Sequence, residues 1–459
     1  MTGPILIAIL VGAVVFVIVA TARFRAHPFL VLLIAAYLVG LAAGLPGNEV
    51  ITAITEGFGG TIGYIGIVIA AGTIIGALLE KTGGAALMAR SVLRWIGKAR
   101  SLLAMGITGL FVSIPVFCDS GFVVLSPLNR SLARQSGTSL ASFTVALSMG
   151  LYAGHVFIPP TPGPLAAAGE LGADIGLVML LGFAVCVPVI AATWFFAQVA
   201  GRRIVIEGEH DAEQAGEAPG NVSPVDTAAG DIQLRSAWLA FLPILLPVAL
   251  IAAQSIASLP GRPFGEGNLF VLLRFIGNPN SALLLGVAAA CAAVWRSGGR
   301  VRMEWISESL RTGGLIILIT GAGGAFGKVL QATPIGEYLG GLLGSIGLGA
   351  FSMLVPFLLA ASLKTALGSS TVAIITSASI MFPLLPALGL ASSFGPVLTT
   401  LAIGAGSMTV SHANDSYFWV VSQFSGMTVS QAYKLHTVGS AVAGVTGIVA
   451  VLLLGFVLS

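Results

Sequence analysis

The chain has few charged residues. Only 8% of its 459 residues are Asp, Glu, Lys or Arg, against about 25% in an average soluble domain. By contrast, 56% of the residues are hydrophobic and 60 are glycine. This composition excludes an ordinary soluble protein, because too few charges remain to cover a surface in contact with water. It predicts an all-α polytopic membrane protein in which glycine allows helices to pack closely.

Cysteine is also rare, and several enzyme motifs are missing. Cys118, Cys186 and Cys291 all lie in apolar segments, which favours small packing residues over disulfide partners. The first apolar segment, residues 4–20, has no basic residue before it and no small-residue cleavage site after it, so we expect a retained span. No P-loop, HExxH or nucleophile-elbow motif is present, so neither a nucleotide-driven pump nor an enzyme is expected.

The acidic residues gather in one short stretch between Arg202 and Arg235. There they lie among Gly, Pro, Ala and Ser without apolar periodicity: Glu207, Glu209, Asp211, Glu213, Glu217, Asp226 and Asp231. This composition predicts a flexible soluble linker over residues 204–234. The linker divides the chain into two halves of similar length, residues 1–203 and 235–459.

Both halves show the same order of apolar segments. The expected spans lie near residues 3–22, 28–46, 61–80, 140–157 and 175–199, and then near 236–256, 281–295, 313–331, 395–411 and 437–458. Between the third and fourth span of each half, the apolar regions 101–136 and 345–387 are interrupted in the middle. Each arm is too short for a hydrocarbon core of about 30 Å, so we expect two re-entrant helical hairpins.

The two halves also repeat each other in sequence. At a constant offset the second half repeats three residues of the first, Gly72, Gly76 and Thr82, as Gly323, Gly327 and Thr333. With the N-terminus outside and five full spans per half, most of the 21 basic residues fall in inside loops, as the positive-inside rule requires. An odd number of spans gives the repeats opposite orientations. We therefore predict two inverted repeats, the architecture of secondary transporters, with periplasmic termini and a cytoplasmic linker.

Polar breaks interrupt the apolar segments and are expected to converge where the repeats meet. They are the hairpin tips at 118–121 and 364–371, the break after His155 with its proline run 158–164, and the break 411–416. A charged group at membrane depth costs roughly 2.5–3.5 kcal/mol on insertion scales, so its presence indicates a function. The free N–H groups of half-helices suit an anionic substrate.

The predicted site residues fall into two groups. Hydroxyl, amide and ammonium groups, with glycines that allow close approach, are expected to bind substrate: Ser120, Gly121, Thr161, Lys364, Thr365, Gly368, Ser369, Ser370, Thr371 and Asn414. Ionisable groups at membrane depth are expected to carry protons: Asp119, His155, His412 and Asp415, with Asp415 the most closely coupled to substrate. Structural alternatives stay open. The hydroxyls at 369–371 would cap a helix, either histidine would bond to a carbonyl, and Lys364 would reach to the interface.

At these breaks the sequence resembles the gluconate permease (gluconate:proton symporter) family of the ion transporter superfamily. Residues 114–122, 155–164, 368–373 and 411–416 carry the similarity, which runs along nearly the whole chain. The resemblance implies proton-coupled uptake of a sugar acid or a related small hydroxy acid across a bacterial inner membrane. The family also includes carriers for D-serine. Thr161 stands between two prolines where many members have His, which leaves a shorter acid such as glycerate or a hydroxybutyrate open.

The sequence therefore predicts a secondary active transporter that takes up gluconate or a related acid with protons, by alternating access. A carrier for another small acid or D-serine, a passive channel, and a membrane-embedded enzyme built on the histidines and aspartates are the alternatives. Four titratable groups at membrane depth favour protons over Na⁺. The expected partners are the acid anion, protons and the lipid bilayer. A homodimer and a homotrimer are both open, and no nucleic acid, cofactor or metal is expected.

Overall fold

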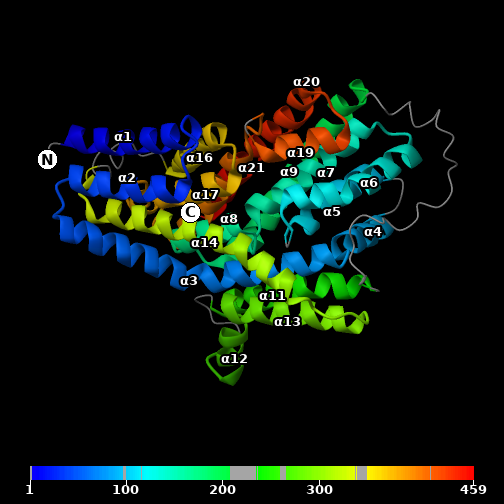
Figure 1. Ribbon diagram of the computed structural model, residues 1–459, viewed down its shortest axis with the longest axis horizontal. Helices are drawn as coiled ribbons and strands as arrows, with labels where there is room; N and C mark the ends of the chain where they lie inside the picture. Colours follow the sequence, from blue (N-terminus) through cyan, green and yellow to red (C-terminus); the bar gives the residue numbers. More distant parts are fainter. Residues whose placement is uncertain are drawn as a thin grey trace.

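The computed structural model describes residues 3–96, 100–114, 116–206, 234, 236–258, 265–335, 338, 349–413 and 415–458. Most of the predicted linker, and the predicted site residue Asn414, lie outside these residues. Every regular element that they form is a helix, so the all-α fold class predicted from composition is confirmed. Figure 1 shows these helices as a long bundle.

The N-terminal helices form a stack with one helix from the second half. Helices α1 (Gly3–Ala22), α2 (Pro28–Ala42) and α3 (Gly47–Lys81) pack on one another, and α14 (Met303–Ala332) contacts both α2 and α3 (Figure 1). Proline at the first position of α2 has the backbone angle that starts a helix. Helix α3 begins well before the predicted span, since no proline interrupts the sequence between Gly47 and Lys81 and the glycines within it do not end the helix.

Two helical pairs occupy the regions predicted as hairpins. In the first half α5 (Ser101–Ser113) is followed by α6 (Cys118–Ser136); in the second, α16 (Leu354–Leu367) is followed by α17 (Ser370–Met381). The first break was predicted at 118–121, but these residues form the opening turn of α6, and the chain turns just before Phe117, the N-cap. The proline at 115 lacks an N–H to continue α5, which accounts for the earlier break. The second pair turns at Gly368, whose φ of +72° favours glycine.

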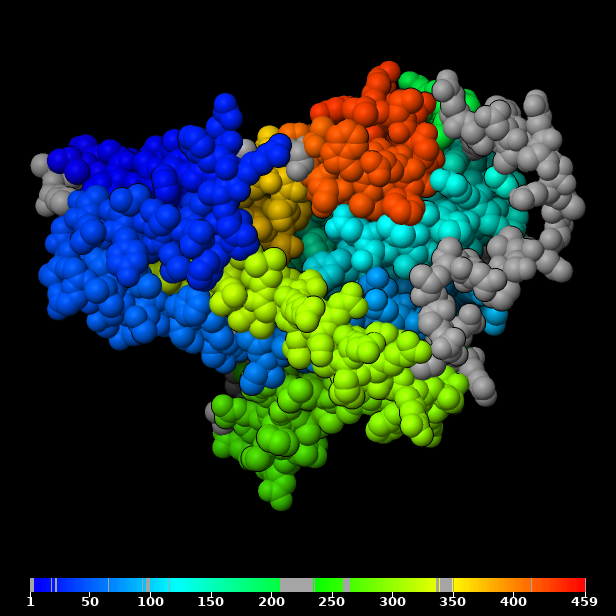
Figure 2. Space-filling model, in the orientation of Figure 1, coloured from blue at the N-terminus to red at the C-terminus, as the bar shows by residue number. Residues whose placement is uncertain are grey.

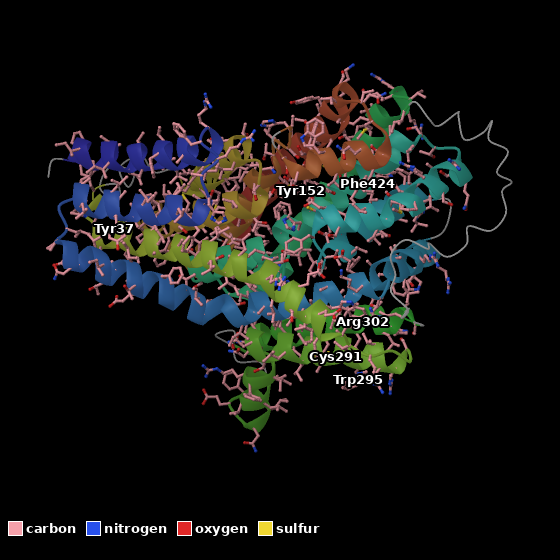
Figure 3. All side chains as sticks on the ribbon, in the orientation of Figure 1. Tyr37, Tyr152, Cys291, Trp295, Arg302 and Phe424 are labelled. Carbon is pink, nitrogen blue, oxygen red and sulfur yellow. The ribbon has the colours of Figure 1, made fainter. Side chains whose placement is uncertain are left out.

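Two further apolar segments are broken helices. Helix α7 (Leu140–Phe157) gives way to α8 (Pro162–Leu171), and α18 (Gly395–Met408) gives way to α19 (Ser416–Ser425). Each short segment packs against the hairpin of the opposite half: α8 on α17, and α19 on α6. Arg130 Nη2 of α6 also donates to the backbone carbonyl of Phe424 in α19, 2.7 Å away; Figure 3 labels Phe424. The interrupted segments of the two halves are therefore interlocked.

The remaining helices complete the bundle. They are α4 (Gly84–Ile96), α9 (Ile175–Ala200), η2 (Gly201–Arg203), α11 (Ala237–Ala257), α12 (Asn268–Ile276), α13 (Pro279–Arg296), η3 (Gly349–Met353), η4 (Phe382–Leu384), α20 (Val429–Ala432), the π-turn η5 (Tyr433–Thr437) and α21 (Val438–Leu458). In Figure 2 the green α11–α13 region projects from the main body.

Many helices carry large apolar side chains on the outside of the bundle. Exposed examples on α1, α9, α11 and α21 are Val11, Val15, Val187, Phe195, Leu242, Leu453 and Phe456. Five described helices are long and apolar enough to cross a membrane, or up to seven if each of two bent pairs is one span. The expected spans at 28–46 and 395–411 appear as shorter apolar helices. These exposed apolar faces suit contact with lipid.

Candidate functional site

The centre of the site is a buried ion pair between two breaks. Lys364 lies in the last turn of α16, and Asp415 is the N-cap of α19. Their Nζ and Oδ2 atoms are 2.5 Å apart, and the two residues are only 0% and 3% exposed. The ammonium also donates to the carbonyl of Gly368 at 3.3 Å. Because isolated charges at this depth are costly, each group depends on the other for neutralisation.

A hydrogen-bond chain leads away from the carboxylate. Ser411 Oγ donates to Asp415 Oδ2 at 2.5 Å, and the backbone N–H of Tyr417 donates to Oδ1 at 3.1 Å. The same Ser411 oxygen lies 2.9 Å from His436 Nε2. A hydroxyl has one proton, so if Ser411 donates to Asp415, His436 Nε2 carries the proton toward Ser411. The chain therefore joins ammonium, carboxylate, hydroxyl and imidazole in a buried line.

A second set of contacts joins α17 to α7. The hydroxyl oxygens of Tyr152 and Ser370 are 2.7 Å apart, and Thr371 Oγ1 lies 3.4 Å from His155 Nε2. The ring of Tyr152 also lies 5.7 Å from Lys364 Nζ, close enough for a cation–π contact. Figure 3 shows Tyr152 near the centre of the molecule. Its ring thus connects the ion pair to the polar start of α17.

A narrow cleft lies beside these residues. It is lined by Gly72, Thr73, Ile114, Val116, Phe117, His155, Pro160, Thr161 and Pro162. The wall includes residues between α5 and α6, which precede the predicted tip at 118–121, and the predicted break between α7 and α8. Thr161 is the N-cap residue of α8, and its hydroxyl donates to the carbonyl of Ile158 at 2.6 Å.

Asp119 lies within electrostatic reach of the ion pair. It is in the first turn of α6, and both Lys364 and Asp415 act on its carboxyl group. Its Oδ1 is buried and has no hydrogen-bond partner in the part of the chain that is described. Next to it Ser120 is half-buried, and a Cβ on Gly121 would come within 2.7 Å of the Leu151 side chain. The first hairpin therefore adds a second carboxyl group to the site.

Other predicted site residues have structural partners. Ser369 Oγ accepts a hydrogen bond from the Val372 N–H and caps α17, and the Thr365 hydroxyl donates to the carbonyl of Ala361. His412 Nε2 lies 3.0 Å from the Thr365 carbonyl. Ser369 thus caps a helix and His412 lies within hydrogen-bond distance of a carbonyl, which are the structural roles left open for them by the sequence.

Sequence reasoning missed several residues of the centre. Tyr152, Tyr417 and His436 are at most 2% exposed and surround the ion pair, and Ser411 bonds to it directly. Tyr152 gives no signal, because aromatic residues are common in apolar helices. His436 lies in η5, the single π-helix among the described residues, next to an apolar run. Short π-helical segments are frequent at functional sites. A histidine at that position was the one readable signal.

Comparison with known proteins identifies the family of this chain. The family model of the GntP family permeases matches residues 4–457. The chain belongs to the GntP permease family. Its relatives include a gluconate permease of Pseudomonas aeruginosa, 36% identical over 97% of this chain and 96% of that protein. Two Escherichia coli relatives are the inner membrane permease YgbN, 32% identical (96% of each chain), and the D-serine transporter DsdX, 31% identical (98% of each).

Solved structures of similar fold are also transporters. This GntP family permease aligns with the YdaH transporter of Alcanivorax borkumensis at a TM-score of 0.65 and 14% identity, over 94% of this chain and 99% of that one. It aligns with MtrF of Neisseria gonorrhoeae, described with a class of antimetabolite efflux pumps, at a TM-score of 0.67 and 16% identity, over 96% and 97%. At these identities the likeness establishes the fold alone. Since its relatives are permeases, the protein is a multi-pass membrane transporter.

Proposed function

We propose that this GntP permease takes up gluconate or a related small sugar or hydroxy acid together with protons, by alternating access in the inner membrane. The observation that carries the proposal is the buried Lys364–Asp415 pair at the junction of a hairpin and a broken helix. The relatives named for gluconate support the substrate class.

The ion pair offers a direct means of coupling. The ammonium group of Lys364 carries a full positive charge at the centre of the site, and in this conformation it is paired with the carboxylate of Asp415. When Asp415 accepts a proton, the ammonium is free to bind the carboxylate of a substrate. Two unit charges about 4 Å apart at an effective dielectric of about 20 interact by roughly 4 kcal/mol, so an ionised Asp415 strongly opposes a second anion. Loss of the proton then restores the pair and releases the substrate.

The hydroxyl-bearing residues around the pair suit the rest of the substrate. Ser370 and Thr371 stand at the N-terminus of α17, where N–H groups and the helix dipole favour negative charge. Thr161 stands at the N-terminus of α8, where the helix dipole has the same sign but Pro162 and Pro164 have no N–H to donate. The hydroxyl of Tyr152 contacts Ser370, and the ring of His155 contacts Thr371. Together they offer donors and acceptors for the hydroxyl groups of a sugar acid. Asn414 is proposed as a further contact to these groups.

The Ser411–His436 chain is proposed as the route by which the proton reaches Asp415. Ser411 Oγ contacts Asp415 Oδ2, and His436 Nε2 contacts Ser411 Oγ in turn. Asp119 and His155 stand beside the site as further proton carriers. In this proposal His412 supports the backbone of the second hairpin.

The interlocked halves suit alternating access. The repeats 1–203 and 235–459 are proposed to be inverted, with periplasmic termini, a cytoplasmic linker, and either two or three copies in the assembly. Each short segment of one half packs on the hairpin of the other. A shift of one hairpin therefore has to move the broken helix that contacts it.

D-serine uptake is a second candidate, favoured by the pairing of opposite charges. An amino acid carries both a carboxylate and an ammonium, and Lys364 and Asp415 would match them. A relative is a D-serine transporter. In that case Asp415 has to stay ionised to bind substrate, which separates the two candidates.

Uptake into proteoliposomes tests the function. Purified protein should accumulate gluconate, glycerate, 3-hydroxybutyrate or D-serine against a gradient when the outside is acidic. Accumulation should collapse with a protonophore and persist when K⁺ replaces Na⁺, because no sodium is needed. Equilibration without accumulation would indicate a channel, and a requirement for Na⁺ would contradict proton coupling.

A further inference from the structure

A carboxylate outside the site described above lies between three helices. Glu170 stands at the end of α8 and points toward α3 and α14. Thr61 Oγ1 of α3 donates to Glu170 Oε2 at 3.2 Å. On α14, a Cβ added to Gly327 would lie only 2.6 Å from Glu170 Oε1, so a larger residue there would displace the carboxyl group from its present position.

In the part of the chain that the structure describes, no positive charge neutralises this carboxylate. Among the described residues Glu170 has no ion-pair partner, and Thr61 is the side chain that hydrogen-bonds to it. The neighbouring elements have other ionisable groups, among them Tyr64 on α3, Lys328 on α14 and Asp174 after α8. Helices α17 and α18, which also pack on α8, have no ionisable side chain, while α7 has Tyr152 and His155 near the break and α9 has Cys186. Glu170 is half-buried, and a single hydroxyl is a weak partner for an ionised carboxylate whose access to water is restricted.

The position of Glu170 links a cavity to the substrate site. Leu171, the next residue, lines a cavity of about 870 Å³ together with Ala332 and Thr333 at the end of α14, residues following α17, and Pro396. In the proposed topology this cavity opens to the periplasm. The other end of α8 is Thr161 at the narrow cleft, nine residues or roughly 14 Å along the helix. Glu170 therefore lies between the outer cavity and the cleft.

We propose that Glu170 is a second proton-binding carboxylate of the transport cycle, on the outer approach to the substrate cleft. The inference rests on the proposed uptake of an organic anion. Ionised, Glu170 repels an anion that moves from the cavity toward the cleft. Protonated, Glu170 no longer repels the anion, and its carboxyl group can donate a hydrogen bond to Thr61 Oγ1. An acidic periplasm thus promotes access of the substrate before Asp415 is reached.

Carbodiimide labelling tests the protonation of Glu170 without any substrate. Dicyclohexylcarbodiimide reacts with protonated carboxyl groups in apolar surroundings, and peptide mass spectrometry locates the adduct. In the purified wild type we expect label on Glu170 at acidic pH and its loss at alkaline pH, with none on residue 170 of Glu170→Gln. Absence of label on Glu170 at every pH, while Asp119 or Asp415 is labelled, would overturn the proposal.

Transport by Glu170→Gln supplies the functional test. The variant has no charge at residue 170, so its initial rate of gluconate uptake should fall less steeply than that of the wild type as external pH rises, while the pH dependence and the accumulation that arise from Asp415 persist. Glu49→Gln, at an exposed position on α3, is the matched control and should keep the wild-type pH profile. An unchanged pH profile in Glu170→Gln would show a purely structural role. If the wild type accumulates none of the tested acids, the proposed function fails, whereas the labelling result still reports on Glu170.

Discussion

At the scale of single residues, the site combines one full positive charge with a carboxylate that neutralises it. Lys364 was readable from the sequence because a lysine inside an apolar run is rare, and Asp415 for the same reason. That they bond to each other was not readable, since they are far apart along the chain and meet only through the packing of α16 against α18. Tyr152 and Ser411 join them by the same long-range packing.

Two neighbouring hydroxyls should respond differently to removal. Thr371→Ala deletes a group that faces His155 at the site, so the KM for substrate should rise several-fold while the amount of folded protein stays the same. Ser369→Ala deletes the cap of α17, so it should lower stability by about 0.5–2 kcal/mol with a smaller effect on KM. Uptake kinetics and thermal unfolding of the two purified variants measure this contrast. An equal KM in wild type and Thr371→Ala would mean that this hydroxyl does not face the substrate.

At the scale of elements, apolar periodicity and polar breaks predicted most helix positions within a few residues. For example, the apolar segments 281–295 and 437–458 coincide with α13 and α21 to within two residues at each end. Short polar-flanked helices such as α4 and α12 were missed, because they lie along the surface and carry no long apolar run. The break of the first hairpin was predicted about one turn too late. The polar residues around Asp119 indicated a break at 118–121, whereas α5 ends at Ser113, just before the proline at 115.

Glycine at the contact of α5 and α7 has a testable role. A Cβ on Gly150 would collide with the backbone oxygen of Gly106, and one on Gly109 would come within 2.7 Å of the Leu147 oxygen. Such close backbone packing is typical of small residues at helix interfaces in membranes. Gly150→Leu should therefore separate the first hairpin from α7 and reduce the yield of folded protein, since overpacking typically costs about 1–3 kcal/mol or more.

The matched control is Gly12→Leu on α1, where nothing lies within 4 Å of the added Cβ. Membrane expression followed by size-exclusion chromatography compares the two variants. Equal yields of monodisperse protein would contradict the close α5–α7 contact.

At the scale of the whole molecule, two interlocked halves of the chain surround one buried ion pair. The chain's family and its transporter fold follow from the comparisons and the helical architecture. The direction of the halves in the membrane and the proton coupling are proposals, for which the basic-residue distribution and the Lys364–Asp415 pair are the support. In this proposal the proton binds Asp415 and the organic anion binds Lys364, the two partners of one ion pair, so binding of the proton favours binding of the anion.

Substrate movement by Asp415→Asn tests this central claim most directly. The amide resembles the protonated carboxyl group and leaves Lys364 for the substrate, so exchange of labelled for unlabelled gluconate across proteoliposomes should continue. Accumulation driven by an acidic exterior should be lost, because no proton is then released at residue 415. Exchange in the variant also shows that it is folded. If Asp415→Asn still concentrates gluconate with the wild-type pH dependence, the proton is carried elsewhere and the account is wrong.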